Sequence, residues 1–398
     1  MFEFDYLAEQ KAKLKVIGVG GAGGNAINRM IQTGMHGVDF IAINTDAQDL
    51  ENNAAMHKVQ IGKSLTKGLG AGAKAEIGRE AIETDKEAVQ ALLEDVDMVF
   101  ITAGMGGGTG TGAAPVIAQL AREMKILTVG IVTLPFNFEG PKRMQRAITG
   151  LVELRKACDT MIAIPNQKLM TVVDKSTTVM EAFKTADSTL HQAVQGISDL
   201  INVHGLINLD FADVETIMKN MGDAIMGTGV ASGEERAVLA AQQAISSPLL
   251  DNAQISGAQG VLVNITGGPD LTLIEVDEAT SIIFEEAGQD ANIIFGAVID
   301  PSMTEEIRVT VIATGFNHSD FVEEEKRQPQ RAEQRYESHI PAHAEHINMP
   351  LISQKQNKQY VPEQPALAAK PRFVFDDTNP SLFDNDLEIP AFLRQQHK

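Results

Sequence analysis

Two glycine-rich stretches of this sequence have the composition of phosphate-binding loops. The first, Gly18–Asn25, ends the apolar run KVIGVG, and the second, Gly104–Gly112, ends the apolar run DMVFITAG. Each leads into a stretch of helical composition, AINRMIQTG or APVIAQLAREM. Glycines let a backbone approach a phosphate closely, and the N-terminus of a helix offers free N–H donors. The sequence therefore predicts two loops that bind phosphate groups.

The first loop alone also fits a different class of ligand. Gly18, Gly20 and Gly23 satisfy the GxGxxG pattern of dinucleotide-binding folds, and Asp46 could serve as the acid that binds the ribose. The second loop favours a nucleoside triphosphate, because two such turns in one sheet form two phosphate-binding walls and a dinucleotide fold needs only one. No GxxxxGK[ST] motif is present, since the GKS stretch at 62–64 lacks the glycine five residues upstream. We therefore expect a triphosphate held by backbone amides without a P-loop lysine.

The elements that position these loops alternate between strands and helices. Continuous apolar runs of the kind that form buried parallel strands lie at 15–20, 38–44, 97–104, 126–134 and 159–165. Apolar residues at spacings of three and four then predict one long helix from Val172 to about Asn202. Beyond it, AIMGTGVA, GVLVNITG, NIIFGAVI and IRVTVIATGF are predicted strands, and LTLIEVDEATSIIFEEAG contains a predicted helix. The pattern indicates an α/β fold with a parallel Rossmann-like sheet, a long central helix and a second α+β domain.

The composition changes near Phe316, where the folded part is expected to end. All 34 glycines precede this point, whereas eight of the 15 prolines follow it. The next segment has few large apolar residues and cannot bury enough surface to offset its ordering entropy. We expect a flexible N-terminal segment, a nucleotide-binding α/β domain, a central connecting helix, a C-terminal α+β domain, a disordered linker and a partner-binding peptide. Their expected bounds are 1–12, 13–171, 172–203, 204–316, 317–373 and 374–398.

Composition and charge exclude several classes of function. The formal net charge of -20 at pH 7 disfavours nonspecific binding to nucleic acid and direct attraction to anionic lipid. No apolar run approaches the roughly 20 residues that span a bilayer, and the N-terminus lacks the pattern of a signal peptide. Cys158 is the only cysteine, so an intramolecular disulfide is impossible and a partly buried thiol is expected. We expect a cytoplasmic protein with no nucleic-acid partner and no direct insertion into a membrane.

The motif GGGTGTG at 106–112 is the signature of the tubulin superfamily. The chain resembles the FtsZ family of this superfamily, the cell-division GTPases, in its Gram-negative bacterial form. The resemblance covers about residues 13–316 and extends to the C-terminal tail. It implies a tubulin-like GTPase domain that binds GTP and GDP together with Mg²⁺, and we predict no direct protein ligand to the metal.

The resemblance assigns the phosphates, and any magnesium ion beside them, to four loops. The implied residues are Gly20, Gly21, Ala22, Gly23, Gly24 and Asn25 in the first loop, Asn44 and Asp46 in the second, Ala71 and Gly72 in the third, and Gly104, Gly106, Gly107, Gly108, Thr109 and Gly110 in the signature loop. The sequences of the second and third loops are less informative by themselves.

Further residues are implied to contact the ribose and the nucleotide. Thr133 lies in the fourth predicted strand, and Glu139 and Arg143 follow it. A glutamate and an arginine four residues apart would otherwise form an ordinary ion pair on a helix surface. By resemblance, Glu139 accepts hydrogen bonds from sugar hydroxyls and Arg143 lies beside the nucleotide.

Recognition of guanine has a chemical explanation. Guanine presents N1–H and an exocyclic amino group together, so one carboxylate can accept both hydrogen bonds, whereas adenine would leave that carboxylate unpaired. Asp187 follows Phe183 by four residues and lies on the same face of the predicted helix. The resemblance implies that Phe183 stacks on the base, that Asp187 accepts from its edge and that Asn166 makes the other base contact. Without it, Phe183 would be a core residue and Asp187 a solvated one.

The implied catalytic residues are Asn208, Asp210 and Asp213, directly after the long helix. Two carboxylates three residues apart at the start of a helix would ordinarily be capping groups. In the tubulin superfamily this loop completes the nucleotide site of the next subunit. Asp210 and Asp213 then position and polarise the attacking water, and Asn208 supports that arrangement. The resemblance therefore implies a head-to-tail homopolymer whose GTPase activity requires assembly.

The C-terminal segment contains an apolar cluster at the end of the expected linker. Such clusters commonly fold as they dock into a groove of a partner. By resemblance, Asp386, Ile389, Pro390, Phe392 and Leu393 bind membrane-tethering and regulatory division proteins. The implied location is the division ring at midcell.

Two other classes of function remain open at this point. A Rossmann oxidoreductase would retain NAD and would need a proton donor, for which no suitable set of histidines is apparent. A noncatalytic scaffold would bind nucleotide only for structure, and Asp210 and Asp213 argue against it only through the resemblance.

Overall fold

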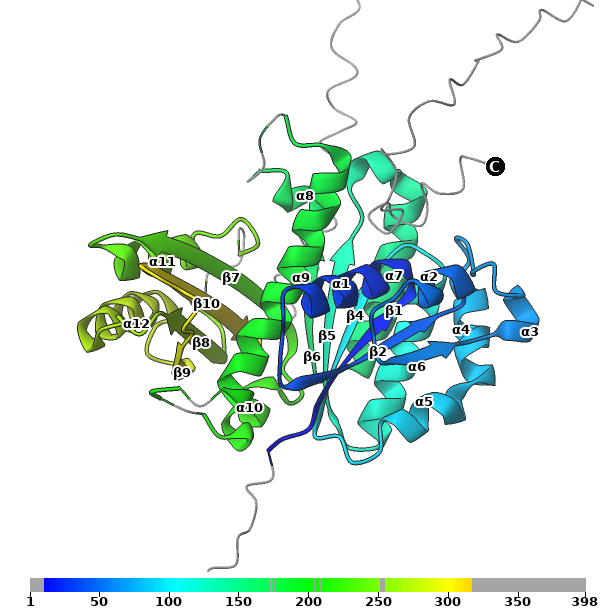
Figure 1. Cartoon of the computed structure of the whole chain (residues 1–398), viewed down its shortest axis with the longest axis horizontal. Helices are drawn as coiled ribbons and strands as arrows, with labels where there is room; N and C mark the ends of the chain where they lie inside the picture. Colours follow the sequence, from blue (N-terminus) through cyan, green and yellow to red (C-terminus); the bar gives the residue numbers. More distant parts are fainter. Residues whose placement is uncertain are drawn as a thin grey trace, which may run out of the picture. The chain divides into compact units, whose positions relative to one another are not determined.

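One ten-stranded sheet organises the part of the chain that the structure describes. The computed structural model describes residues 11–171, 174, 176–203, 205–207, 209–250 and 255–316. The strands lie in the order β3-β2-β1-β4-β5-β6-β7-β10-β8-β9. Figure 1 shows the first half of the sheet in blue and cyan, the second half in green and yellow, and the long helix α9 between them.

The first half of the sheet is parallel. Its strands are β1 (Leu14–Val19), β2 (Val38–Asn44), β3 (His57–Gln60), β4 (Met98–Gly104), β5 (Leu127–Leu134) and β6 (Thr160–Pro165). The five predicted strands are confirmed, each to within one residue. They form continuous apolar runs because helices cover both faces of the sheet. Only β3 was not predicted, since its sequence HKVQ contains no apolar run.

Helices cover both faces of this half. One core lies under α1 (Gly20–Gln32), α9 (Val179–Asn202) and α10 (Phe211–Met218). The other lies under α4 (Ala75–Thr84), α5 (Lys86–Leu92), α6 (Thr109–Glu123) and α7 (Pro141–Ala157). The short elements α2 (Ala47–Glu51), α3 (Lys63–Thr66), η1 (Asn137–Glu139) and α8 (Asn166–Leu169) lie in the connections. Because the strands are parallel, the loops that follow them lie along one edge of the sheet.

The long central helix begins later than the sequence pattern predicted. The predicted start at Val172 is wrong, because α9 begins at Val179. Thr178 caps the helix: its hydroxyl accepts from the N–H of Glu181, and the Glu181 carboxylate accepts from the N–H of Thr178 at 2.7 Å. Among the described residues no helix, α9 included, is long and apolar enough to cross a membrane.

The second half continues the same sheet with mixed pairing. β7 (Gly222–Ser232) pairs in parallel with β6 and antiparallel with β10 (Glu306–Thr314). β8 (Gly260–Gly267) then pairs antiparallel with β10 and parallel with β9 (Asn292–Ile299). A third core lies under α11 (Arg236–Ile245) and α12 (Leu273–Ala287), and the four strands and α12 agree with the prediction. On the opposite face of the sheet, Asn264 donates to the carbonyl oxygen of Gly196 in α9 at 3.1 Å.

Candidate functional site

The first glycine loop turns directly from β1 into α1. Gly20, the first residue of α1, has a φ of +74°, a left-handed value that favours glycine. A Cβ on Gly18 would lie 2.4 Å from the carbonyl oxygen of Gly23, and one on Gly23 would lie 2.5 Å from that of Thr102 in β4. Gly18 and Gly23 therefore let α1 pack closely on the sheet. This contact places the N-terminus of α1 at the edge where β1 and β4 end.

The signature loop between β4 and α6 contacts three other segments. A Cβ on Gly20 would lie 3.0 Å from the nitrogen of Gly110, so the two glycine loops touch. A Cβ on Gly108 would lie 2.7 Å from the carbonyl oxygen of Gly72, and one on Gly106 would lie 2.7 Å from that of Arg143. Gly107 alone among the glycines of this loop has open space where a Cβ would be. The structure thus brings the signature loop together with the first loop, which contains Gly20, and the third loop, which contains Gly72. Gly107 is the residue of the signature loop whose Cβ position is not covered by protein.

The loop after β2 is joined to the signature loop by a buried hydrogen bond. The hydroxyl oxygens of Thr45 and Thr109 lie 2.6 Å apart. Asn44 is buried, its side-chain oxygen accepts from the N–H of Asp46, and its side-chain nitrogen donates to Asp49 at 3.2 Å. The Asp46 carboxylate accepts from the N–H of Gln48 and caps α2. Asn44 and Asp46 therefore lie beside the signature loop, and Asp46 also has a structural role.

The residues predicted to contact the ribose and the nucleotide lie at the end of β5 and after it, and two of them form an ion pair. The carbonyl oxygen of Thr133 accepts from the N–H of Met105 at 2.9 Å, which fixes the start of the signature loop. The carboxylate of Glu139 accepts from the N–H of Phe136 at 2.8 Å and pairs with Nε of Arg143 at 3.2 Å. The Glu139 side chain is only 4% exposed. The ion pair between Glu139 and Arg143 that their spacing suggested is therefore present. It lies close to the signature loop, whose Gly106 contacts Arg143.

Three phenylalanines form a cluster that the sequence analysis did not assign as a group. Phe136 and Phe138 are stacked with ring centroids 5.1 Å apart. Phe183 meets both rings edge-on, at 5.3 Å from Phe136 and 6.4 Å from Phe138. Phe138 is 60% exposed, whereas Phe136 is buried. The sequence signal for this cluster was the run PFNF, which places two aromatic residues directly after β5. The structure shows that both lie next to Phe183, the predicted base contact.

Two acceptors lie near the start of α8 and on α9. Asn166 is buried, and its side-chain oxygen has no hydrogen-bond partner among the described residues. Burial raises the pKa of Asp187 to about 7, and the positive charge of Arg29 opposes this shift. Buried polar atoms are normally paired, and desolvation disfavours the ionised carboxylate. Both groups therefore suit a ligand that supplies N–H donors.

Asp210 and Asp213 lie at the other edge of the sheet from the glycine loops. The 24-residue helix α9 spans about 36 Å and crosses the sheet between the two edges. Near its C-terminus, Asn202 donates to the carbonyl oxygen of Gly37, directly before β2 begins. Asp210 and Asp213 are exposed, and the Asp213 carboxylate accepts from the N–H of Asp210 at 3.4 Å in the capping arrangement of α10. Figure 1 shows α10 at the far end of α9 from α8.

Asn208, the third predicted catalytic residue, lies outside the described residues, and so do the predicted tail contacts Asp386, Ile389, Pro390, Phe392 and Leu393. The expected linker at 317–373 also lies outside them, and so do residues 1–10 of the expected N-terminal segment. Of the predicted site residues, the structure therefore describes those of the predicted phosphate, ribose and base contacts, together with Asp210 and Asp213.

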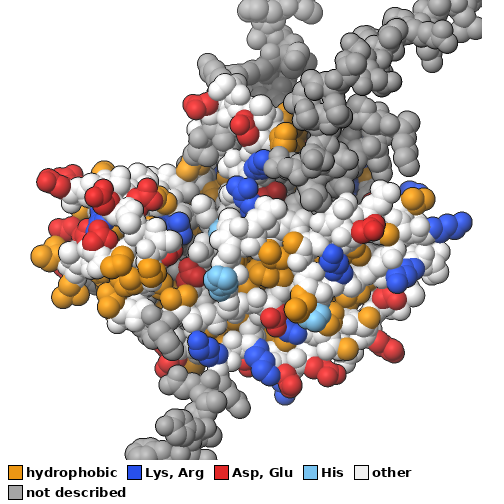
Figure 2. Space-filling view, viewed as in Figure 1, with side chains coloured by type: hydrophobic (Ala, Val, Ile, Leu, Met, Phe, Trp, Pro, Cys, Tyr) orange, Lys and Arg blue, Asp and Glu red, His pale blue; other side chains and the backbone are white. Residues whose placement is uncertain are grey.

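Large apolar side chains are exposed in the second half, where β9 ends and α12 begins. Leu206 donates its N–H to the carbonyl oxygen of Ala297 near the end of β9, and its residue is 67% exposed. β9 is in parallel register with β8, whose end leads to α12, and there Leu273 and Ile274 are 81% and 70% exposed. Figure 2 shows hydrophobic side chains gathered over the part of the molecule that contains α12 and β9. Exposed apolar side chains therefore lie at this end of the second half, around the end of β9 and the start of α12.

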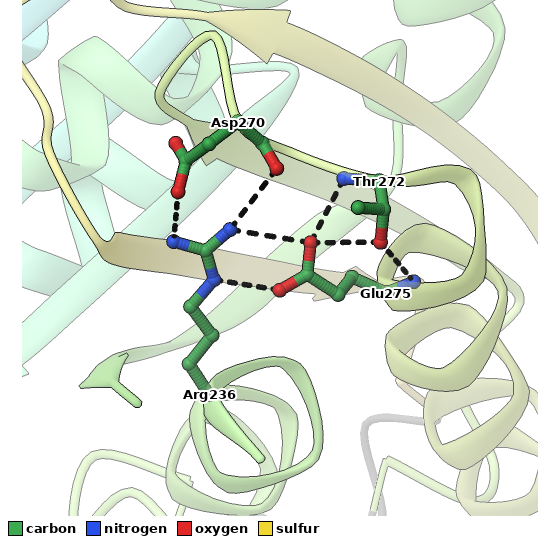
Figure 3. A network of polar contacts seen from close by, with 4 residues as sticks. All are labelled: Arg236, Asp270, Thr272 and Glu275. Carbon is green, nitrogen blue, oxygen red and sulfur yellow. Dashed lines mark hydrogen bonds and ion pairs between the residues drawn. The ribbon is translucent and has the colours of Figure 1, made fainter. Parts of the chain in front are cut away.

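A buried arginine holds the segment that presents this surface. Nη1 of Arg236 lies 2.7 Å from the Asp270 carboxylate, and its Nε lies 2.6 Å from Glu275 (Figure 3). The Arg236 side chain is 7% exposed, and the hydrogen bonds that it donates to Glu275 lower the pKa of that carboxyl. Glu275 in turn accepts from the N–H of Thr272 at 2.8 Å. Residues 270–275 are therefore fixed around the start of α12, a contact that the sequence analysis missed because 34 residues separate Arg236 from Asp270.

The chain is similar in sequence and in fold to proteins of the tubulin and FtsZ families. Residues 13–174 match the sequence model of the Tubulin/FtsZ family, GTPase domain, and residues 222–317 match that of the FtsZ family, C-terminal domain. An empty FtsZ dimer of M. jannaschii is 46% identical, with a TM-score of 0.75 over 78% of this chain and 90% of that chain. A tryptophan-to-tyrosine mutant of the same protein gives the same identity and score over 93% of its chain. CetZ2 of Haloferax volcanii, a GTPγS-bound protofilament, shares the fold at 23% identity, with a TM-score of 0.67 over 82% of this chain and all of that chain.

Proposed function

This chain belongs to the Tubulin/FtsZ family and is a GTPase, and from that premise we propose that it polymerises head-to-tail and hydrolyses GTP at the contact between two subunits. The filaments form the cytokinetic ring at the division site in the cytoplasm. The FtsZ of M. jannaschii is described as a dimer and CetZ2 as a protofilament, which supports self-association of the present chain.

The separation of the two halves of the site carries this proposal. The glycine loops follow the ends of β1 and β4, whereas Asp210 and Asp213 lie beyond α9 at the opposite edge of the sheet. A span of about 36 Å prevents these carboxylates from reaching a phosphate bound to their own chain. A head-to-tail contact brings the exposed start of α10 of one subunit to the glycine loops of the next, and such a contact propagates as an open filament.

Each subunit binds the nucleotide through groups with distinct roles. Backbone N–H groups of the two glycine loops hold the phosphates, assisted by the loop with Ala71 and Gly72. Glu139 and Arg143 contact the ribose and the nucleotide. Phe183 stacks on the base, and Asp187 and Asn166 accept its N–H donors. The unpartnered oxygen of Asn166 supports this role, because a base would supply the missing donor.

Asn44 and Asp46, beside the expected position of the phosphates, would help to hold a magnesium ion. The side-chain oxygens of Asn44 and Asp46 each retain lone pairs beyond their intramolecular contacts and can accept hydrogen bonds from metal-bound water. When bound, the ion neutralises charge on the phosphates. Asp210 and Asp213 of the adjacent subunit orient the attacking water, with Asn208 supporting them, so that most of the rate enhancement comes from positioning and electrostatics.

The proposal is tested by measuring phosphate release from GTP and Mg²⁺ across a range of protein concentrations, with light scattering in parallel. We expect turnover per subunit to be low at first and to rise above a threshold at which scattering also appears. Turnover per subunit that stays constant from the lowest concentration would contradict a site shared between subunits.

The C-terminal peptide is proposed to recruit membrane-tethering and regulatory division proteins. Asp386, Ile389, Pro390, Phe392 and Leu393 supply a short apolar cluster with an acidic neighbour, which suits docking into a groove. Removal of residues 374–398 is expected to leave GTP turnover unchanged while abolishing recruitment of the filament to vesicles that carry a tethering protein.

Alanine at position 107 tests the phosphate contact of the signature loop. A Cβ at Gly107 meets no protein atom within 4 Å, so Gly107→Ala is expected to unfold at the same temperature as the wild type. A methyl group in front of the bound phosphate should weaken GTP binding by at least about tenfold. Equilibrium binding of GTP to the monomer measures the effect. Unchanged affinity would place the phosphate elsewhere.

Nucleotide affinity should depend on pH through Asp187. In the free protein, burial raises the pKa of this carboxyl to about 7, whereas two N–H donors from guanine stabilise its ionised form and lower its pKa. Binding therefore releases a proton below pH 7, and GDP affinity should fall by up to about tenfold per pH unit as pH decreases from 7 to 6. Titration calorimetry across this range tests it. Asp187→Asn should bind more weakly and lose the pH dependence, and a wild-type affinity that is constant with pH would contradict the role.

A further inference from the structure

Gly106 of the signature loop is held from both sides by side chains outside the predicted site. Its N–H donates to the hydroxyl of Thr111 at 2.8 Å, and its carbonyl oxygen accepts from Nε of Arg146 at 3.1 Å. Gly106 has a φ of +96°, and a Cβ there would lie 2.7 Å from the carbonyl oxygen of Arg143. The loop therefore lies directly on α7, and both peptide groups that flank Gly106 have fixed orientations.

The orientation of one peptide group determines where the next N–H points. In a trans peptide the C=O and the following N–H lie in one plane and point in opposite directions. Because the Gly106 carbonyl points toward Arg146 on α7, the N–H of Gly107 points away from α7. That N–H has no hydrogen-bond partner among the described residues, and a Cβ built on Gly107 would have no protein atom within 4 Å. The donor is thus presented to a ligand.

We propose that Arg146 and Thr111 are positioning residues that aim the Gly107 N–H at a phosphate of the bound guanine nucleotide. The proposal rests on the nucleotide site proposed above and adds two residues to it. Peptide groups between glycines rotate easily, since no side chain restricts them. Holding Gly106 at both its N–H and its carbonyl removes this freedom before the nucleotide binds, which is the reason preorganised donors bind an anion more tightly.

The test is the dissociation of N-methylanthraniloyl-GDP from the full chain, at a concentration below assembly and with excess GDP as competitor. Arg146→Met and Thr111→Val should each accelerate dissociation by about tenfold, since one donor to the phosphate is no longer aimed. In the double variant, dissociation of the nucleotide should be accelerated by much less than about a hundredfold, the product of the two single effects. The effects are not additive because both side chains hold the same residue. Thr111→Ser keeps the hydroxyl and should dissociate at the wild-type rate.

Matched controls separate this role from general stability. Arg155 lies on the same helix, and its Nε pairs with Asp223 at 2.7 Å, so Arg155→Met should alter thermal stability without changing dissociation. Dissociation of Arg146→Met at the wild-type rate, or equal rates for Thr111→Ser and Thr111→Val, would overturn the proposal while leaving the nucleotide site intact. Failure of the wild type to bind the probe would overturn the proposed function and the positioning role together. If Arg146→Met does not fold, the comparison of dissociation rates between Thr111→Ser and Thr111→Val still tests the proposal.

Discussion

Asp213→Ala is expected to lower GTP turnover by a factor of about 10² to 10⁴ while leaving nucleotide binding to the monomer unchanged. The exposed carboxylate lies at the opposite edge of the sheet from the glycine loops, so its loss does not touch the nucleotide of its own subunit. Loss of its capping contact should cost about 1 kcal/mol or less, which is too little to unfold the protein. Phosphate release at saturating GTP, with GDP affinity measured separately, checks both parts. Glu285→Ala, which removes an exposed carboxylate from α12, is the matched control.

Complementation gives the strongest form of this test. Gly107→Asp introduces a carboxylate where the phosphate should bind and should be inactive alone, yet it retains Asp210 and Asp213. Mixed in equal amounts with Asp213→Ala, it should restore about one quarter of the wild-type turnover, because a random head-to-tail contact joins an intact pocket to an intact Asp213 in one case of four. An inactive mixture of variants that co-sediment in one polymer would rule out a shared site.

Leu273→Glu is expected to raise the concentration needed for assembly by about a hundredfold or more, with GTP binding to the monomer unchanged. The Leu273 residue is 81% exposed beside Ile274, on the segment that Arg236 holds. Covering a leucine by a partner contributes about 1.5–3 kcal/mol, and burying a glutamate in its place costs more, so each subunit contact should weaken by two orders of magnitude. Sedimentation at increasing protein concentration measures the threshold.

A second exposed apolar residue provides the control for this prediction. Val152 is 39% exposed on α7, in the nucleotide-binding half, and Val152→Glu introduces the same charge there. Assembly of Val152→Glu at the wild-type threshold would assign the effect to the start of α12. Assembly of Leu273→Glu at the wild-type threshold would exclude this segment from the contact between subunits.

The local sequence determined the elements that have a strong local signal. Five parallel strands were predicted to within one residue because strands buried on both faces require continuous apolar runs. The signature GGGTGTG was sufficient to indicate the family, and the family models and the FtsZ structures support that assignment. The predicted start of α9 was seven residues too early, because the prediction included the polar run DKSTT at 174–178, whereas the capping box at Thr178 begins the helix.

Contacts between distant segments were decided only by the tertiary structure. Identical glycines in one loop have different surroundings: Gly108 lies against loop 70–72, whereas Gly107 has open space. Arg146 lies 40 residues from Gly106, and nothing in its local sequence indicates that it holds the carbonyl of that glycine. The sequence places Asp213 directly after a long helix, but its distance from the glycine loops depends on the direction in which α9 crosses the sheet. Residue type and spacing specify local conformation, whereas the strand order and the direction of each crossing determine which groups meet.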